Sequence, residues 1–374
     1  MTAPKALVVG GTGTTGPHVL SGLLERGYDV AMFHRGVHEP PGLPDVEHVH
    51  GDPHFAESIT AALGTREFDV VVSMYGRLAV IAGMMGDRCG QFIGVTGTIV
   101  WENSLLPYSV RPSGMKVLVR ESDPLADAHG AAPYFCARVL EAERAVLDAA
   151  AADRFRGTVF HYPILYGPND VVPREWSVLK RIHDKRPFIF VTDAGLAISV
   201  RCAARNAAHS LLLAVDRPDV ANGESYNVGD DDQFTLRQWM EVLVDIVGGE
   251  LEIVSIPMEI GRATFAEQNP MEGRLPHALV DTSKIRRELG YKDVVTAKDA
   301  MKESVDWLLA HPPNSVDFGS FVDQFDYATE DRLLAAYRRA VEQINAAVPR
   351  EIPTRRHPMP HPKAPGEARD QAGR

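Results

Sequence analysis

A glycine-rich turn near the N-terminus constrains the fold more than any other part of the sequence. The segment Gly10–Gly16 reads GGTGTTG and directly follows the apolar run Lys5–Val9. Valine and leucine then return at helical spacing over residues 19–24, and Pro17 suits a first helical turn, where its missing N–H is not needed. Evenly spaced glycines permit a tight turn and let backbone N–H groups approach a pyrophosphate. The order strand, glycine turn, helix therefore predicts a dinucleotide-binding fold.

Strand and helix patterns alternate through the first half of the chain. Short apolar runs predict further strands at 28–33, 46–50, 68–73, 90–96 and 158–161, and helical patterns occupy 17–24, 59–63, 79–86 and 137–152. This alternation predicts an α/β protein with a Rossmann-type doubly wound parallel sheet. Later, helical patterns at 200–215 and 235–247, with strand candidates near Tyr226 and at 251–256, predict a smaller C-terminal substrate lobe.

These patterns divide the chain into four parts. We expect a nucleotide-binding domain over 1–167 and a substrate-binding lobe over 168–312, with segments around 197–250 returning to the sheet. A helical extension is expected over 313–350, carried by the pattern at 321–348. The tail at 351–374 has prolines, histidines and both charge signs without a periodic apolar face, so we expect it to be mobile.

Composition excludes several classes of partner. The chain has 374 residues, 45% of them hydrophobic, and a net charge of -11, which disfavours nucleic acid and anionic membranes as partners. No apolar stretch approaches the roughly 18 residues that span a bilayer, and the N-terminus lacks signal-peptide features, so we expect a cytoplasmic protein. The three cysteines form no C-x-x-C pair, which predicts reduced, buried thiols rather than disulfides or a zinc knuckle.

Two other chemistries are not supported by the sequence. Residues 48–54 read HVHGDPH, which loosely matches a metallohydrolase pattern, but Pro53 breaks the spacing. Alternation along an edge strand explains His48 and His50 without a metal, so we predict no metal site. No G-x-S-x-G elbow follows a strand, which disfavours a serine hydrolase.

Further motifs follow the glycine turn along the chain. They are Gly51-Asp52, Tyr134-x-x-x-Arg138, Tyr166-Gly167-Pro168, Tyr226-Asn227-Val228-Gly229 and the segment 281–291. Together, from Lys5 to about Leu309, they resemble the extended short-chain dehydrogenase/reductase superfamily, the NAD(P)-dependent epimerase/dehydratase group. The second half is also similar to the chloroplast stem-loop-binding relatives, some of which bind RNA.

The resemblance implies three catalytic positions. Tyr134 would exchange a proton with the substrate oxygen, and Arg138 stands where the family has a lysine that holds the ribose and favours the tyrosinate. A free phenol has a pKa of about 10, so this chemistry needs a nearby cation. Thr96 would orient the substrate oxygen; if the motif is aligned in a second register, Thr98 takes this position instead. The alternatives are a core tyrosine, a solvated pair of Arg138 with Glu141, and threonines bonded to their own backbone.

Cofactor choice depends on the end of the second strand. An acidic residue there would bind the ribose of NAD, whereas His34-Arg35 offers a cation for the 2′-phosphate of NADP. We therefore expect NADP, with NAD as the less favoured cofactor; the alternative is a solvent-facing Arg35. The resemblance implies these cofactor-binding residues: Gly10, Thr12, Gly13, Thr14, Thr15, Gly16, His34, Arg35, Asp52, Ser73, Met74, Tyr75, Arg138, Pro163 and Leu165.

The predicted function is an NADP-dependent oxidoreductase that transfers hydride at a carbonyl or hydroxyl carbon of a small molecule. Ile164 and Leu165 beside the Tyr-Gly-Pro turn favour a substrate less polar than a nucleotide sugar, and Trp176 and Arg201 are weaker candidates for the cleft. The alternatives are a nucleotide-sugar epimerase/dehydratase and a catalytically impaired dinucleotide-binding module that regulates or binds RNA. The resemblance also implies a homodimer through helices 79–86 and 137–152.

Overall fold

The computed structural model describes residues 2–74, 77–105, 111–130, 132–260, 277–313, 323, 325–348 and 364–366. The chain forms two compact units, residues 1–324 and 325–374. The helix α12 (Tyr327–Ala347) lies in the second unit, whereas the sheet and the candidate site belong to the first. The tail predicted at 351–374 lies outside the described residues except for 364–366.

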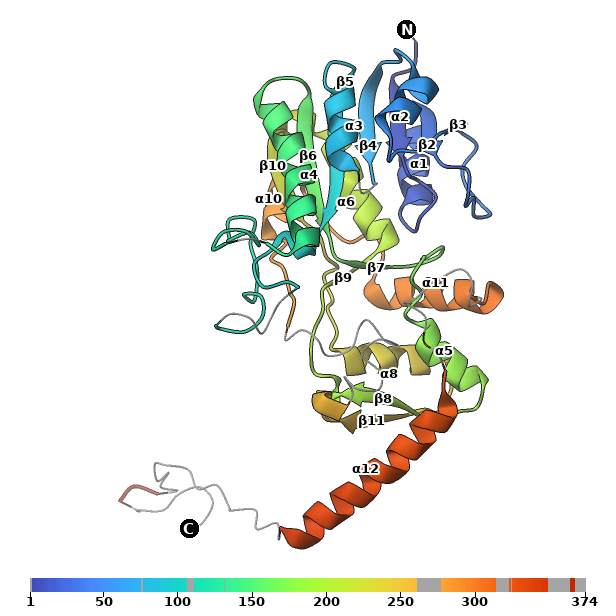
Figure 1. Ribbon diagram of the computed structural model, residues 1–374, viewed down its shortest axis with the longest axis vertical. Coiled ribbons are helices and arrows are strands. Elements are labelled where there is room, and N and C mark those ends of the chain that lie inside the picture. The colour runs from blue at the N-terminus through green and yellow to red at the C-terminus, as the bar shows by residue number, and fades with distance from the viewer. Residues whose placement is uncertain are drawn as a thin grey trace. The chain divides into compact units, whose positions relative to one another are not determined.

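A parallel sheet forms the centre of the first unit (Figure 1). Among the described residues it has seven strands, in the order β10-β6-β5-β4-β1-β2-β3, and each pairs with its neighbours in parallel. The predicted Rossmann-type sheet is therefore confirmed. The strands are β1 (Lys5–Val9), β2 (Asp29–His34), β3 (Glu47–His50), β4 (Phe68–Ser73), β5 (Cys89–Gly97), β6 (Arg156–Tyr162) and β10 (Glu224–Asn227).

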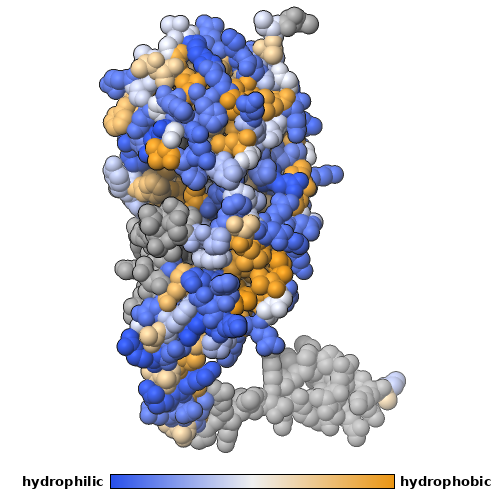
Figure 2. Space-filling model, turned by 90° about the vertical axis from the view of Figure 1, so that its right-hand side faces the viewer, coloured by the Kyte–Doolittle hydropathy of each residue, from blue (hydrophilic) through white to orange (hydrophobic). Residues whose placement is uncertain are grey.

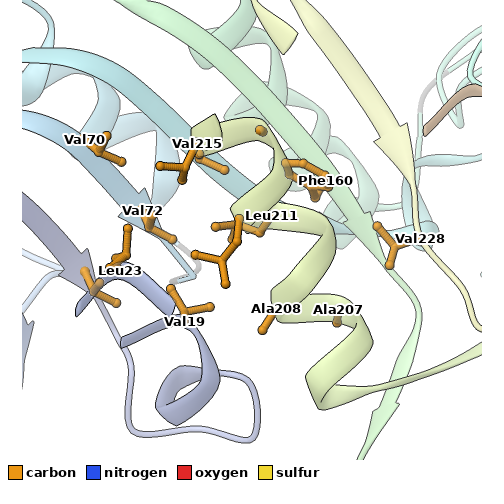
Figure 3. Packing of buried hydrophobic residues seen from close by; sticks show 14 of the residues in the cluster. Val19, Leu23, Val70, Val72, Phe160, Ala207, Ala208, Leu211, Val215 and Val228 are labelled. Atoms are coloured by element: carbon orange, nitrogen blue, oxygen red, sulfur yellow. The ribbon is translucent and has the colours of Figure 1, made fainter. Parts of the chain in front are cut away.

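Helices cover both faces of this sheet, because its inner strands are apolar on both sides. On one face, α1 (Gly16–Glu25) and α6 (Ala204–Asp216) pack Val19 and Leu211 against strand residues such as Val72 and Phe160 (Figure 3). The opposite face is covered by α2 (Ala56–Leu63), α3 (Leu78–Met85) and α4 (Tyr134–Ala151). These helices complete the doubly wound architecture.

The C-terminal part of the unit has its own apolar core. Two small parallel pairs, β7 (Ile164–Tyr166) with β9 (Arg201–Ala203) and β8 (Phe188–Thr192) with β11 (Glu252–Ile256), lie beside helices that bury Leu179, Trp239 and Met301. The helices and the short turn of this region are α5 (Trp176–His183), η2 (Asp193–Gly195), α8 (Leu236–Val247) and α11 (Ala297–Ala310). The helices α7 (Pro218–Ala221) and α10 (Ser283–Leu289) instead pack against α6 and against the sheet strands β6 and β10.

A network of buried polar groups connects this region to the sheet. Asp230 accepts hydrogen bonds from the Tyr166 hydroxyl at 2.7 Å and from the Asn206 amide at 2.8 Å. The Asn206 oxygen in turn accepts from the backbone N–H groups of Val294 and Val295, at 2.9 and 3.1 Å. Burial is the main cause that raises the pKa of Asp230. The Asp230 carboxylate thus links strand β7 to helix α6, and Asn206 links that helix to the segment at 294–295.

Some sequence predictions need correction. The helix predicted over 200–215 was wrong at its start: residues 201–203 form β9, which pairs with β7, and α6 begins only at Ala204. The strands β7 and β8 were not predicted, since they are short and continuously apolar. The helical pattern at 321–348 corresponds to α12, which begins at Tyr327; residues 321, 322 and 324 lie outside the described part.

The surface is mainly hydrophilic on the face drawn in Figure 2, with hydrophobic residues gathered in several groups between the polar ones. Within the described residues, no helix combines the length and the apolar character needed to cross a bilayer.

Candidate functional site

The order of the sheet strands places a crevice between β1 and β4. In chain order, β2 and β3 follow β1 on one side of it in the sheet, and β4, β5 and β6 then follow on the other side. Ligands of doubly wound folds bind at the carboxyl ends of the strands where this reversal occurs. A cleft of about 360 Å³ lies there. Its lining residues are Gly10, Gly11, Thr12, Gly13, Thr14, Thr15, Gly16, His34, Arg35, Gly36, Val37, His38, Pro53, Met74, Leu165 and Val171.

The glycines of the turn differ in what surrounds them. Gly10 and Gly11 have φ angles of +97° and +94°, which favour glycine because other side chains are strained there. A Cβ on Gly16 would stand 1.9 Å from the Gly11 carbonyl oxygen, so Gly16 lets α1 pack directly against the turn. A Cβ on Gly13 would meet no described heavy atom within 4 Å. Since Gly13 lines the cleft, that space leaves room for a ligand to approach the backbone.

The N-terminus of α1 is suited to an anion. Within the described residues no side chain caps it, and its first turn has no acidic residue. Thr15, the N-cap residue, donates its hydroxyl to the sulfur of Met74 at 3.4 Å, and the Thr14 hydroxyl contacts the Asn169 carbonyl oxygen at 3.4 Å. Backbone N–H groups at a helix start, together with the helix dipole, attract phosphate. These residues therefore fit the pyrophosphate of a dinucleotide.

The loop after β2 forms another wall of the cleft. Arg35, Gly36, Val37 and His38 all line it, so a cation stands where the ribose end of a dinucleotide is expected. The His34 side chain is only 4% exposed, and its Nδ1 accepts from the Gly36 N–H at 3.3 Å. Burial, followed by the proximity of the other histidines, lowers the pKa of His34. Arg35 is thus the more accessible cation of the predicted pair.

Two other predicted cofactor residues, Asp52 and Ser73, lie at or just after the carboxyl ends of β3 and β4. The Asp52 carboxylate accepts from the backbone N–H and the Nδ1 of His54, at 2.9 and 2.7 Å, and these bonds lower its pKa. Asp52 does not line the cleft, whereas its neighbour Pro53 does. The Ser73 hydroxyl, at the end of β4, is buried with no hydrogen-bond partner among the described residues. Tyr75 lies outside the described residues.

Tyr134 and Arg138 lie on the first turns of α4. Tyr134 is the first residue of that helix, and 83% of its surface is exposed. Arg138 donates to the Glu141 carboxylate at 2.6 Å, with both side chains about half exposed. Neither residue lines the cleft around the glycine turn. The structure therefore places the two on one exposed stretch of helix, apart from the glycine-lined end of the site.

The predicted orienting hydroxyls lie at the carboxyl end of β5. Thr96 is opposite His161 in the pairing of β5 with β6, and its Oγ1 is buried with no hydrogen-bond partner among the described residues. Thr98 opens the short 3-10 turn η1 (Thr98–Val100). Orphaned buried hydroxyls at Thr96 and Ser73 lie at the edge of the sheet where ligands bind in this fold.

The remaining predicted residues divide between the cleft and the core of the C-terminal region. Leu165 lines the cleft, and Pro163 lies between β6 and β7. Trp176 packs partly buried against the apolar core of that region. Arg201 is 4% exposed, and its guanidinium lies 4.3 Å from the centre of the Trp239 ring. Trp176 and Arg201 thus lie outside the lining of the cleft at the glycine turn.

A pair of carboxyls near the cleft, the buried Glu175 and the partly buried Asp170, is not marked by any motif in the sequence. Burial is the main cause that raises the pKa of Asp170 and of Glu175, and the negative charge of Asp170 raises the pKa of Glu175 further. The Thr14 hydroxyl lowers the pKa of Asp170, which places that carboxyl beside the glycine turn. Shifted pKa values beside a cleft are common in functional sites.

Several motif residues outside the cleft support the fold. Asn227 accepts hydrogen bonds from the Trp101 indole and from the His161 ring, both at 3.2 Å, and donates to the Val119 carbonyl at 3.1 Å. Asp281 accepts from the N–H of Ser283 at the start of α10. These motifs therefore identify the architecture more than the chemistry.

No family model matches the sequence. Over 149 residues the chain is 25% identical to UDP-D-apiose/UDP-D-xylose synthase 2 of Arabidopsis thaliana, a match that covers 38% of this chain and only 37% of that protein. It is 25% identical over 340 residues to 4-hydroxy-2-methyl-3-oxo-4-farnesyl-3,4-dihydroquinoline-1-oxide ketoreductase of Stigmatella aurantiaca, covering 80% and 96%.

Solved structures of NAD-dependent epimerases and dehydratases share the fold. A dTDP-glucose 4,6-dehydratase from Bacillus anthracis in complex with NAD superimposes with a TM-score of 0.62 at 15% identity, covering 83% of this chain and 97% of that one. A UDP-glucose 4-epimerase from Bifidobacterium longum in complex with NAD+ and UDP gives a TM-score of 0.64 at 16% identity, covering 82% and 99%. At these identities the likeness shows the fold.

Proposed function

Because the chain has the fold and the motifs of the extended short-chain dehydrogenase/reductase superfamily, we propose that it is an NADP-dependent oxidoreductase acting at a carbonyl or hydroxyl carbon of a small molecule. The observation that supports this best is the cleft at the glycine turn. There, open space at Gly13, a helix start that no described side chain caps and the cation of Arg35 meet at the carboxyl ends of β1 and β2.

Each part of the cleft has a role in holding the dinucleotide. The backbone from Thr12 to Gly16 would hold the pyrophosphate, and Arg35 would pair with a 2′-phosphate, which favours NADP over NAD. Asp52 would contact the adenine end, and Leu165 with Pro163 would border the nicotinamide end. When bound, the nicotinamide supplies a hydride acceptor or donor.

Tyr134, Arg138 and Thr96 are the proposed catalytic residues. Tyr134 would hold or release the proton on the substrate oxygen. The Arg138 guanidinium would stabilise the tyrosinate and donate to the ribose, which requires it to exchange its partner Glu141 for the ligand. The Thr96 hydroxyl, which has no partner among the described residues, would donate to the substrate oxygen.

The proposed substrate is less polar than a nucleotide sugar. Ile164 and Leu165 are apolar beside the Tyr-Gly-Pro turn, and Leu165 lines the cleft at the proposed nicotinamide end, where the substrate would approach. The ketoreductase of Stigmatella aurantiaca, by its name, acts on a farnesylated quinoline, which is also a ketone with large apolar parts. Epimerisation or dehydration of a nucleotide sugar, as in the names of the structural neighbours, is the variant that a substrate screen would distinguish.

Cofactor binding is the first test. Tag-free protein is titrated with NADPH and with NADH while nicotinamide fluorescence is followed, and the titrations are repeated with Arg35→Ala. The proposal requires that wild type binds NADPH more tightly and that the variant loses this preference. Arg66→Ala is the matched control, since Arg66 pairs with Glu47 and is outside the cleft lining. No binding of either dinucleotide by wild type would refute the proposal.

The catalytic assignment needs a second variant. Tyr134→Phe should abolish turnover of a carbonyl substrate found by screening with NADPH, while the dissociation constant for NADPH stays within about twofold of wild type. Because Tyr134 is largely exposed, the substitution should not disturb folding. Full turnover in Tyr134→Phe would assign the proton transfer to another group.

A second candidate function is a dinucleotide-binding module without catalysis. The ion pair of Arg138 with Glu141, in the position of the family's lysine, favours it. In that case NADPH binds but no carbonyl compound is reduced, and the Arg138→Lys variant has no reductase activity either. An RNA-binding version would also bind a polyanion column, which the net charge of -11 disfavours.

A homodimer and a cytoplasmic location complete the proposal. The helices α3 and α4 pack side by side on one face of the sheet (Figure 1), as the predicted four-helix interface requires. Light scattering on the full chain tests the dimer.

A further inference from the structure

Three histidines and one glutamate gather at the edge of the sheet. They are His34 at the end of β2, His48 and His50 on β3, and Glu39 in the loop between these strands. We call this group the histidine cluster. It lies next to the cleft, since His34 and the residues 35–38 line that cleft.

Strand register brings the three histidines together. In the parallel pairing of β2 with β3, Met32 lies opposite His48 and His34 lies opposite His50. Side chains alternate between the faces of a strand, so His48 and His50 share one face. The pairing then brings His34 to the same face of the neighbouring strand. The rings contact edge to face, with the His34 centroid 5.0 Å from that of His48 and 4.8 Å from that of His50.

Four of the six distances between the ligand atoms are close to those of a tetrahedral metal site. A zinc ion with bonds of about 2.0–2.1 Å holds its ligand atoms about 3.3 Å apart. In the cluster, His34 Nε2 lies 3.2 Å from His48 Nδ1, and Glu39 Oε1 lies 3.5, 3.4 and 3.3 Å from the ring nitrogens of His34, His48 and His50. All four atoms lie within 4.8 Å of one another.

We propose that the histidine cluster binds one divalent transition-metal ion, with zinc as the best match, through His34 Nε2, Glu39 Oε1, His48 Nδ1 and His50 Nε2. Imidazole and carboxylate groups suit zinc, and four protein ligands form the closed coordination of a structural site. The ion reaches the site from solvent, because the His50 side chain is 59% exposed while His34 is buried.

Metal binding has a consequence for the cleft. Ligation through Nε2 leaves a proton on the Nδ1 of His34, whereas that atom otherwise accepts from the Gly36 N–H at 3.3 Å. Two donors cannot face each other, so the contact with Gly36 opens when the metal binds. Gly36 and its neighbour Arg35 line the cleft. An ion bound to His34 and Glu39 would therefore fix the loop between these two residues and shift the part of the cleft that contacts the dinucleotide.

The test uses the tag-free full chain, freed of metal with a chelator, and Co²⁺ and Zn²⁺ as probes. We expect one equivalent of Co²⁺ to bind with the visible absorption of a tetrahedral site, and Zn²⁺ to displace it. The double variant His48→Gln, His50→Gln should lose at least about a hundredfold in affinity, more than the loss of an outer partner causes. Absence of stoichiometric binding in wild type would overturn the proposal.

The matched control is His54→Gln. His54 belongs to the HVHGDPH pattern but not to the histidine cluster, and its ring donates to Asp52. This variant should keep wild-type Co²⁺ affinity and spectrum; an equal loss in His54→Gln and in the double variant would contradict the cluster as the site. Thermal melts separate binding from misfolding: Zn²⁺ should raise the Tm of wild type and of His54→Gln but not that of the double variant.

Discussion

Gly16 packs against the backbone of Gly11, so closely that a Cβ on Gly16 would stand 1.9 Å from the Gly11 carbonyl oxygen. The glycines of the motif therefore meet two separate structural requirements. Gly16 serves the packing of α1 on the turn, whereas Gly13, whose Cβ position is open, serves the approach of a ligand.

Alanine at these two glycines should produce different defects. Gly16→Ala should destabilise the protein by about 1–3 kcal/mol or more, because overpacking forces the backbone to move. Gly13→Ala should leave the unfolding free energy nearly unchanged but weaken NADPH binding about tenfold, or about 1.4 kcal/mol. Urea unfolding and fluorescence titration measure the two effects. Wild-type affinity in Gly13→Ala would mean that the pyrophosphate binds elsewhere.

Arg138 should matter for binding and not for stability. An exposed ion pair contributes about 0.2–1 kcal/mol, so Arg138→Met should change the Tm little. If the guanidinium holds the ribose, the same variant should bind NADPH about tenfold more weakly. Glu141→Gln is the control, since it removes the pair but keeps the cation, and it should bind NADPH at least as well as wild type. Unchanged affinity in Arg138→Met would assign Arg138 to the solvated surface.

Asp293 should make stability depend on pH. Burial is the main cause that raises the pKa of Asp293 to about 6, from an ordinary value of 3.8. Between these values the unfolded chain has released this proton and the folded chain retains it, so unfolding becomes easier as pH rises through the window. Asp293→Asn keeps an acceptor for the Asp231 N–H. Its Tm should match wild type near pH 4 and exceed it at pH 7; a difference independent of pH would contradict this cause.

The cysteines should be unreactive in the folded protein. All three are buried, and burial raises the pKa of Cys89 to about 12 and that of Cys202 well above its ordinary value. Since the thiolate is the nucleophile, a thiol reagent at pH 8 should label none of them over the minutes in which the unfolded chain is fully labelled. Rapid labelling of the native protein would show that a strand or helix opens locally.

The sequence was a good guide to the sheet and a weaker one beyond it. The strands β1, β2, β4 and β5 are apolar runs next to clear helical patterns, so alternation alone predicts them. The helical pattern of apolar residues in α6 continues backwards through residues 201–203, which form β9. These three residues form a strand because they pair with β7, which lies far away in the sequence. Local patterns do not contain that pairing.

The site was predicted unevenly, for a similar reason. The glycine turn is contiguous in sequence, and the structure places its residues in the cleft. The histidine cluster depends on the register of β2 with β3 and on a loop residue, Glu39, that no motif marks. The alternation of His48 and His50 was noticed in the sequence, but His34 could join them only once the two strands were paired.

The hydrogen bonds that meet at Asp230 and Asn206 affect how such a chain can acquire new substrates. They connect β7, α6 and residues 294–295 through two buried side chains. Of these hydrogen bonds, the one from Tyr166 to Asp230 crosses residue 167, so a lobe exchanged there would have to bring an acceptor for the Tyr166 hydroxyl or leave that buried hydroxyl unpaired, at about 1–3 kcal/mol. Recombination at that boundary is therefore a costly route to new specificity. Substitutions of apolar residues at the proposed nicotinamide end, such as Leu165, where the substrate would meet the cofactor, leave this network intact and offer the easier path for divergence.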